Sequence, residues 1–130
     1  MADSAAKRAP KGLPKRKLAA LRKHLEAEQI QLRAQIAQLD ADFADESWKA
    51  RSDDDAESGT ATFERERTMS LAQNARGLLS AIDRALDRMD DGTYGRCVSC
   101  GELIDINRLE ALPAAVDCLD CRRKAERSAR

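Results

Sequence analysis

The sequence predicts a mainly α-helical protein: a long antiparallel two-helix coiled-coil hairpin, followed by a small four-cysteine module and a short C-terminal helix. Three observations lead to this prediction. Leucines recur every seven residues in the first half of the chain, a second apolar stripe with helical spacing follows, and all four cysteines lie in two C-x-x-C pairs near the end. We divide the 130 residues into a disordered basic arm at 1–13, the hairpin at 14–91 and the cysteine module with its C-terminal helix at 92–130.

The first helix of the hairpin is expected from Pro14 to about Asp45. Residues 1–13 contain almost no large apolar side chain, so they cannot offset the entropy of ordering. Pro14 suits the first turn of a helix, because its missing N–H is not needed there. The following 31 residues contain no Gly or Pro, and leucines form one apolar seam in them: Leu18, Leu25, Leu32 and Leu39.

An acidic stretch at about residues 46–60 interrupts this pattern. Three consecutive aspartates and the sequence Ser58-Gly59-Thr60 disfavour a continuous helix, so we expect a loop of about 15 residues at the tip of the hairpin. Trp48 lies in this stretch. It either closes the end of the seam together with Phe43 and Phe63, or anchors a partner from an exposed position.

The second helix is expected from about Ala61 to Asp91, and Gly92 follows as the residue that ends it. Each apolar seam is too narrow to keep its helix folded alone, so pairing the two helices side by side buries both seams. The second seam consists of residues at alternating spacings of four and three: Leu71, Ala75, Leu78, Ile82, Ala85 and Met89.

The charges are unevenly spread over a chain whose net charge is zero. Residues 1–17 carry +5 and residues 122–130 carry +4, whereas residues 18–121 carry −9. The basic ends are either solvated tails or contacts for a phosphate-bearing or protein partner. The residues that would make such contacts are Lys15, Arg16, Lys17, Arg122, Arg123 and Lys124.

Composition and motifs argue against a membrane protein and against an enzyme. No run of 18 apolar residues occurs, and the basic beginning of the chain lacks the apolar stretch of a secretory signal, so we expect a cytoplasmic protein. His24 is the single histidine, and the sequence contains no nucleophile elbow, phosphate-binding loop or dinucleotide fingerprint.

The four cysteines predict a structural zinc site. Cys97 and Cys100 form one C-x-x-C pair, and Cys118 and Cys121 form the other, 17 residues further on. Two intervening residues let both sulfurs of a pair reach one metal ion at about 2.3 Å. Disulfides are disfavoured in the cytoplasm, and a thioredoxin-like redox pair would need a βαβ framework. Four protein ligands leave no open position on the metal, so the Zn²⁺ is expected to be structural rather than catalytic.

The sequence around the cysteines resembles the DksA/TraR four-cysteine zinc-finger family. The resemblance is carried by DGTYGRCVSCG at 91–101, by RLEALP at 108–113 and by CLDC at 118–121. It implies a regulator of transcription and of the stringent response that binds bacterial RNA polymerase through the secondary channel, often together with the alarmone ppGpp, without requiring a DNA contact. The resemblance also implies that the hairpin tip reaches towards the active centre.

The tip residues that this resemblance puts forward as polymerase contacts are Asp53, Asp54, Asp55, Ala56 and Trp48. Family members carry a D-x-x-D-x-A motif at the tip. Here Asp54-Asp55-Ala56 supplies D-x-A, whereas Arg51 stands where the first aspartate would be. An acidic tip would be attracted to a basic channel and to catalytic magnesium.

Two other functions stay open at this point. The chain could bind DNA or RNA through its basic ends, or it could be a zinc-stapled coiled-coil adaptor or dimer, because the heptad leucines could pair between chains. We expect a monomer, in which the two seams pair within one chain.

Overall fold

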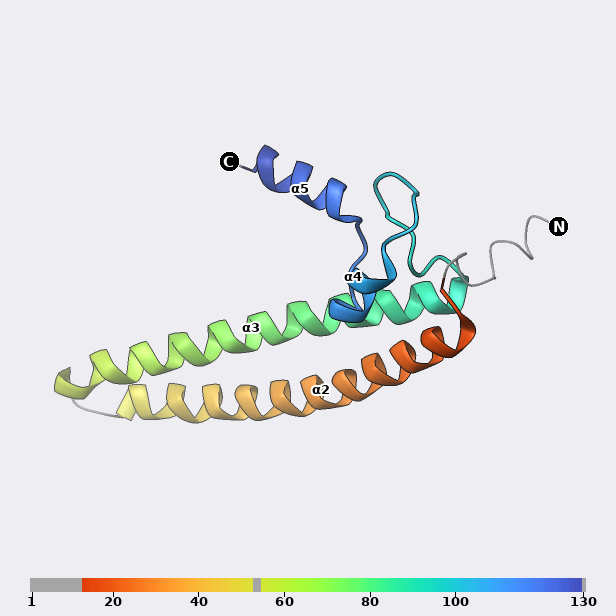
Figure 1. Cartoon of the computed structure of the whole chain (residues 1–130). Coiled ribbons are helices and arrows are strands. Elements are labelled where there is room, and N and C mark those ends of the chain that lie inside the picture. The colour runs from red at the N-terminus through yellow and green to blue at the C-terminus, as the bar shows by residue number, and fades with distance from the viewer. Residues whose placement is uncertain (1–12, 53–54, 130) are drawn as a thin grey trace. The chain divides into compact units, whose positions relative to one another are not determined.

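The structure, a computed structural model, describes residues 13–52 and 55–129, with side chains outside residues 47–58. Figure 1 shows the helices of this part of the chain. They are α2 (Lys15–Ser52), α3 (Asp55–Asp91), α4 (Ile106–Ala111) and α5 (Leu119–Ser128). These residues contain no strand, and one isolated antiparallel bridge joins Arg96 to Leu103. The mainly helical fold with two long packed helices, a cysteine module and a short C-terminal helix is confirmed.

The chain divides into two compact units, which we describe separately. The first unit contains residues up to Glu28 and from Ala81 onwards. In it, α2 and α3 run antiparallel, and an ion pair of 2.6 Å joins Arg22 to Asp90. The buried apolar residues of these two helix segments include four members of the predicted seams, Leu25, Ile82, Ala85 and Met89, and two residues beside them, Leu21 and Leu86.

The start of α2 departs from the expected end of the arm. Residues 1–12 lie outside the described part of the chain, but Leu13 is buried, with only 6% of its surface exposed. Burial of a leucine side chain is worth about 2 kcal/mol, which favours order at this position. Pro14 precedes the helix, and its carbonyl oxygen accepts the N–H of Leu18 at 3.0 Å.

The second unit consists of residues 29–80, where α2 and α3 again run antiparallel. Asp40 and Arg76 form an ion pair of 2.5 Å, and the Thr68 hydroxyl donates to Glu46 at 2.9 Å. Thr68 is buried, as are the small residues Ala72 and Ala75. Small side chains at spacings of four and three let two helices approach closely along this seam.

Two leucines of the predicted second seam lie beside it rather than in it. Leu71 is 44% exposed and Leu78 is 52% exposed, because Thr68 and Ala72 occupy the contact with α2 instead. The expected aromatic cluster is also not formed as predicted, since Phe63 is 69% exposed and Phe43 is only half-buried. The side chain of Trp48 lies outside the described residues.

The loop predicted at residues 46–60 is wrong in its extent. Helix α2 continues to Ser52 and α3 already begins at Asp55, so only residues 53–54 lie outside the described helices. A single glycine costs a helix only about 1 kcal/mol, which the neighbouring helix formers and the packing of the two helices offset. The Asp53, Asp54, Asp55 and Ala56 side chains lie outside the described part of the structure.

Among the described helices, none combines the length and the apolar character that a membrane span requires.

Candidate metal centre

The first pair of cysteines lies on a tight loop directly after α3. Gly95 and Gly101, on either side of the pair, have φ angles of +89° and +77°, which side chains with a Cβ rarely adopt. The N–H of Cys97 donates to the carbonyl of Glu102 at 2.8 Å, and the N–H of Gly101 donates back to Cys97 at 2.9 Å. This hairpin-like loop directs the sulfurs of Cys97 and Cys100 to one side.

The second pair begins α5. Cys118 is the N-cap of this helix, and its Sγ accepts the N–H of Cys121 at 3.4 Å. A backbone bond of 2.8 Å from the N–H of Val98 to the carbonyl of Val116 ties the two cysteine loops together. A main-chain hydrogen bond therefore holds the two cysteine pairs next to each other, in addition to any metal ion that they share.

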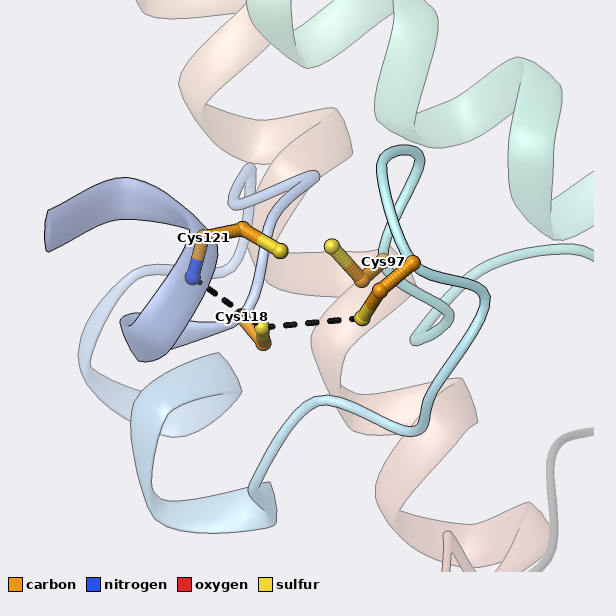
Figure 2. A group of neighbouring side chains, drawn as sticks. Cys97, Cys118 and Cys121 are labelled. Carbon is orange, nitrogen blue, oxygen red and sulfur yellow. Dashed lines mark hydrogen bonds between the residues drawn. The ribbon is translucent and has the colours of Figure 1, made fainter. Parts of the chain in front are cut away.

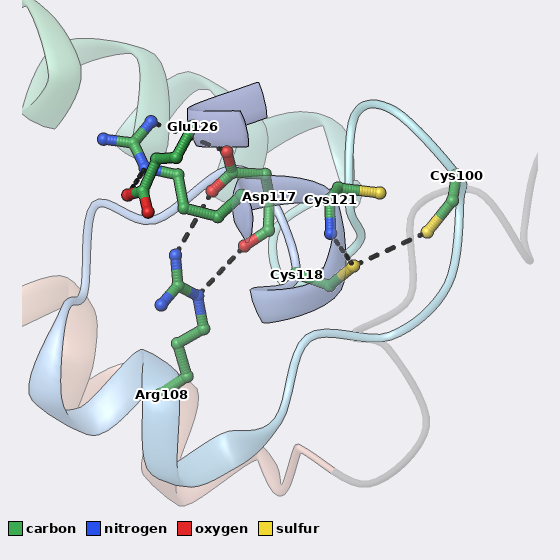
Figure 3. Close-up of polar contacts among 7 residues, drawn as sticks. Cys100, Arg108, Asp117, Cys118, Cys121 and Glu126 are labelled. Carbon is green, nitrogen blue, oxygen red and sulfur yellow. Dashed lines mark hydrogen bonds and ion pairs between the residues drawn. The ribbon is translucent and has the colours of Figure 1, made fainter. Parts of the chain in front are cut away.

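All four Sγ atoms lie within 4.8 Å of one another. Figure 2 shows Cys97 on one loop facing Cys118 and Cys121 on the other, and Figure 3 shows Cys100 beside Cys118. The Sγ atoms of Cys100 and Cys118 are 3.8 Å apart. A zinc ion bound tetrahedrally with Zn–S bonds of about 2.3 Å requires sulfurs about 3.8 Å apart. The donor set is thus the one that a structural Zn²⁺ prefers, and the four cysteines form a structural zinc site.

The thiols also need a cation for electrostatic reasons. Burial raises the pKa of the Cys97 thiol, but hydrogen bonds from the backbone around Cys118, Cys100 and Ser99 outweigh it and lower the pKa to about 6. Contact with the sulfurs of Cys118 and Cys97, together with burial, raises the pKa of Cys121 to about 12. One thiolate at this site therefore disfavours the next, and a bound Zn²⁺ provides the charge that allows all four to ionise.

The Arg88 side chain, near the end of α3, ties this helix to the segment that leads to the first cysteine pair. Arg88 donates to the carbonyl of Thr93 at 3.0 Å and to that of Arg96 at 2.5 Å, and the carbonyl of Arg88 accepts the N–H groups of Thr93 and Tyr94. Arg88 thereby joins the last turn of α3 to the residue immediately before Cys97.

A second guanidinium supports the other pair of cysteines. Arg108 in α4 donates to the carbonyl of Asp117 at 3.1 Å and lies 3.3 Å from its carboxylate, and Arg122 approaches that carboxylate from α5 at 3.7 Å. Figure 3 shows Arg108 and Asp117 beside Cys118. The residue directly before the third cysteine is therefore held by α4 and α5 together.

A small core lies beneath the metal site. Its largest members are Tyr94, Ile104 and Leu109, which are 2%, 4% and 1% exposed. The Tyr94 hydroxyl donates to the carbonyl of Pro113 at 2.8 Å, and burial raises the pKa of this phenol to about 12. Tyr94 and Leu109 belong to the stretches that carry the family resemblance, but their place in a buried core was not predicted.

The basic residues predicted as contacts lie on the surface of the first unit. Lys17 pairs with Glu110 of α4 at 2.7 Å, and Arg122 pairs with Asp117 and with Glu126. No ion pair is found within the described residues for the other four members of the set, all of them exposed: Lys15, Arg16, Arg123 and Lys124. Among the described residues, no ion pair or hydrogen bond joins the α2 members to the α5 members.

Comparison with known proteins agrees with the metal site. Residues 92–127 match the family described as the prokaryotic dksA/traR C4-type zinc finger. The chain is similar to the RNA polymerase-binding transcription factor DksA of Escherichia coli K12, with 34% identity over 109 residues, which cover 84% of this chain and 71% of that protein. It is also similar to the protein of the same name from Caulobacter vibrioides NA1000, with 40% identity over 72 residues, covering 54% of this chain and 51% of that one.

A solved structure extends the likeness to the fold. The transcription factor DksA2 from Pseudomonas aeruginosa superposes with a TM-score of 0.78 and 26% sequence identity, covering 91% of this chain and 89% of that chain. These relatives are named as transcription factors rather than enzymes, in agreement with the prediction from the sequence. The chain belongs to the DksA/TraR family of four-cysteine zinc-finger proteins.

Proposed function

We propose that this protein regulates transcription by binding bacterial RNA polymerase, inserting the acidic end of its helical hairpin through the secondary channel towards the active centre. The observation that carries the proposal is the similarity over 84% of the chain to a polymerase-binding transcription factor, which extends well beyond the cysteine module. A polymerase partner places the action of the protein in the cytoplasm.

Charge supports the direction of insertion. Residues 40–57, which include the end of α2 and the beginning of α3, carry a net charge of −6, whereas the two ends of the chain are basic. A slender acidic segment is attracted to a basic channel and to the magnesium ion at a polymerase active centre, and this attraction raises the rate of productive encounter.

The first experiment measures binding of the zinc-loaded full chain to purified core polymerase in the absence of DNA. We expect a one-to-one complex between a monomer of this chain and the polymerase. Sedimentation of the free chain at several concentrations gives its oligomeric state. Absence of any complex would overturn the proposal, and a concentration-dependent dimer would favour the adaptor function instead.

The second experiment tests the tip. In the triple variant Asp53→Ala, Asp54→Ala and Asp55→Ala, polymerase binding should persist while the effect on transcription in vitro weakens. The matched control removes three exposed acids outside residues 46–60, by Glu26→Ala, Glu66→Ala and Asp87→Ala. An unchanged transcriptional effect in the tip variant would refute the role of the tip but not polymerase binding. Assays with and without ppGpp show whether the alarmone acts together with this protein.

Nucleic-acid binding is the second candidate, favoured by the exposed cations of α2 and α5. It predicts a gel shift with duplex DNA at modest salt, with an affinity that falls steeply as salt rises. Strong DNA binding by a chain that does not bind polymerase would reverse the order of the two functions.

A further inference from the structure

The cysteine module carries a largely apolar groove that borders the metal site at Cys118. The groove has a volume of about 350 Å³ and lies between α4 and the beginning of α5. Three leucines from separate segments converge on it: Leu103 from the bridge after the first cysteine pair, Leu112 from the end of α4 and Leu119 from the start of α5.

The leucines of this groove are exposed although the module has a core of its own. Leu103, Leu112 and Leu119 are 40%, 52% and 46% exposed, whereas Leu109 on the same short helix α4 is 1% exposed. Scattered exposed leucines are ordinary, but apolar side chains that gather around one concave site mark a surface for a protein partner. The three side chains are held on elements that the metal site and the Arg108–Asp117 contact fix in place.

The polar groups of the groove indicate what kind of partner fits it. The Arg108 guanidinium is engaged by Asp117, and the Asp105 carboxylate accepts the N–H of Asn107 at 3.1 Å. Asp120 is exposed and has no hydrogen-bond or ion-pair partner among the described residues. A small-molecule site would need several convergent polar groups, whereas this groove offers apolar surface with acids at its rim.

We propose that this groove docks a segment of RNA polymerase that presents an apolar side chain beside a lysine or arginine. The apolar side chain packs against the three leucines, and the cation lies at the rim near Asp105 and Asp120. A two-fold contact between two copies of this chain would bring the acidic rims face to face, which is unfavourable. The inference rests on the proposed function, since it names the surface by which the cysteine module contacts the polymerase.

The test compares the affinity of full-length, zinc-loaded variants for core polymerase. Leu112→Ser should weaken binding about tenfold, because roughly half of a leucine side chain is available for burial. The matched control is Val98→Ser, which changes another exposed apolar residue of the same module outside the groove and should alter the affinity less than twofold. Asp120→Asn should weaken binding at low salt and match the wild type at high salt.

The outcomes separate this inference from the proposed function. Wild-type binding that Leu112→Ser leaves unchanged, or that Val98→Ser weakens equally, overturns the groove while polymerase binding stands. Failure of the wild type to bind polymerase overturns both. If Leu112→Ser loses its zinc, a photocrosslinking amino acid at position 112 decides: a crosslink to a polymerase subunit supports the groove. Crosslinks only between copies of this chain, only to nucleic acid, or to nothing refute it.

Discussion

Replacing glycine by alanine should change the free energy of unfolding in opposite directions at Gly77 and at Gly101. Gly77 lies in the interior of α3 and is exposed, and a Cβ added there would meet no atom within 4 Å. An alanine at this position therefore restricts the unfolded chain without a clash. We expect Gly77→Ala to stabilise the protein by about 1 kcal/mol.

Gly101 provides the matched opposite case. A Cβ there would also meet nothing within 4 Å, but the backbone has a φ of +77°. An L-residue in that region costs about 1–2 kcal/mol, so Gly101→Ala should destabilise the cysteine module although there is room for the methyl group. The contrast isolates backbone conformation from packing.

The assay is urea denaturation of the zinc-loaded chain, followed by the far-ultraviolet circular dichroism of its helices. The midpoint should rise for Gly77→Ala and fall for Gly101→Ala, and Gly59→Ala, a second exposed helical glycine with open space, should behave like Gly77→Ala. Destabilisation by Gly77→Ala would show that this glycine is needed for a bend or a close contact that the structure does not contain, and would refute the reasoning.

Three further predictions concern the metal site, the buried phenol and a surface ion pair. Removal of zinc with a strong chelator should unfold the cysteine module, seen as loss of amide protection in hydrogen exchange for residues 93–122, and protection unchanged after chelation would contradict a structural role. Tyr94 is the only tyrosine, so its absorbance at 295 nm should titrate near pH 12. Because the pKa of Tyr94 is raised in the folded state, the contribution of this phenol to stability is complete below about pH 10 and is lost as the pH rises to about 12. Titration near pH 10 would instead mean that the phenol is exposed. A double-mutant cycle on Asp40 and Arg76, whose side chains are each about half-exposed, should give a coupling of about 0.5 kcal/mol that disappears in 1 M salt; a coupling of several kcal/mol would contradict their exposure.

The local pattern of the sequence was enough to predict the two long helices and the zinc ligands. Heptad leucines such as Leu25 indicate which face of a helix is buried. Two C-x-x-C pairs indicate a metal site, because the two cysteines of each pair are close enough in sequence to bind the same ion. The same local logic failed at residues 46–60. Ser58-Gly59-Thr60 has a weak intrinsic preference for helix, but packing between the two long helices outweighs it. A local sequence pattern carries no information about that packing.

The supporting contacts of the metal site could not be predicted because they depend on tertiary placement. Arg88 is one of many arginines in the sequence, and only the turn after α3 brings two carbonyls within its reach. Leu103, Leu112 and Leu119 are spread over 17 residues of the sequence, and only the folded arrangement of the cysteine module brings them to one groove. The exposure of Leu71 and Leu78 has a similar origin, since neighbouring Thr68 and Ala72 compete for the same contact with α2.

Cys118 has two functions, since the sulfur that would bind the ion also accepts the N–H of Cys121 in the first turn of α5. The last helix buries none of its residues, so it is attached to the rest of the protein mainly through Cys118, Cys121 and the ion pair between Arg122 and Asp117. Because two of the four ligands, Cys118 and Cys121, lie at the beginning of α5, we expect removal of the ion to release the first turn of this helix. We therefore expect the arginines of α5 to lose their fixed spacing when the ion is removed.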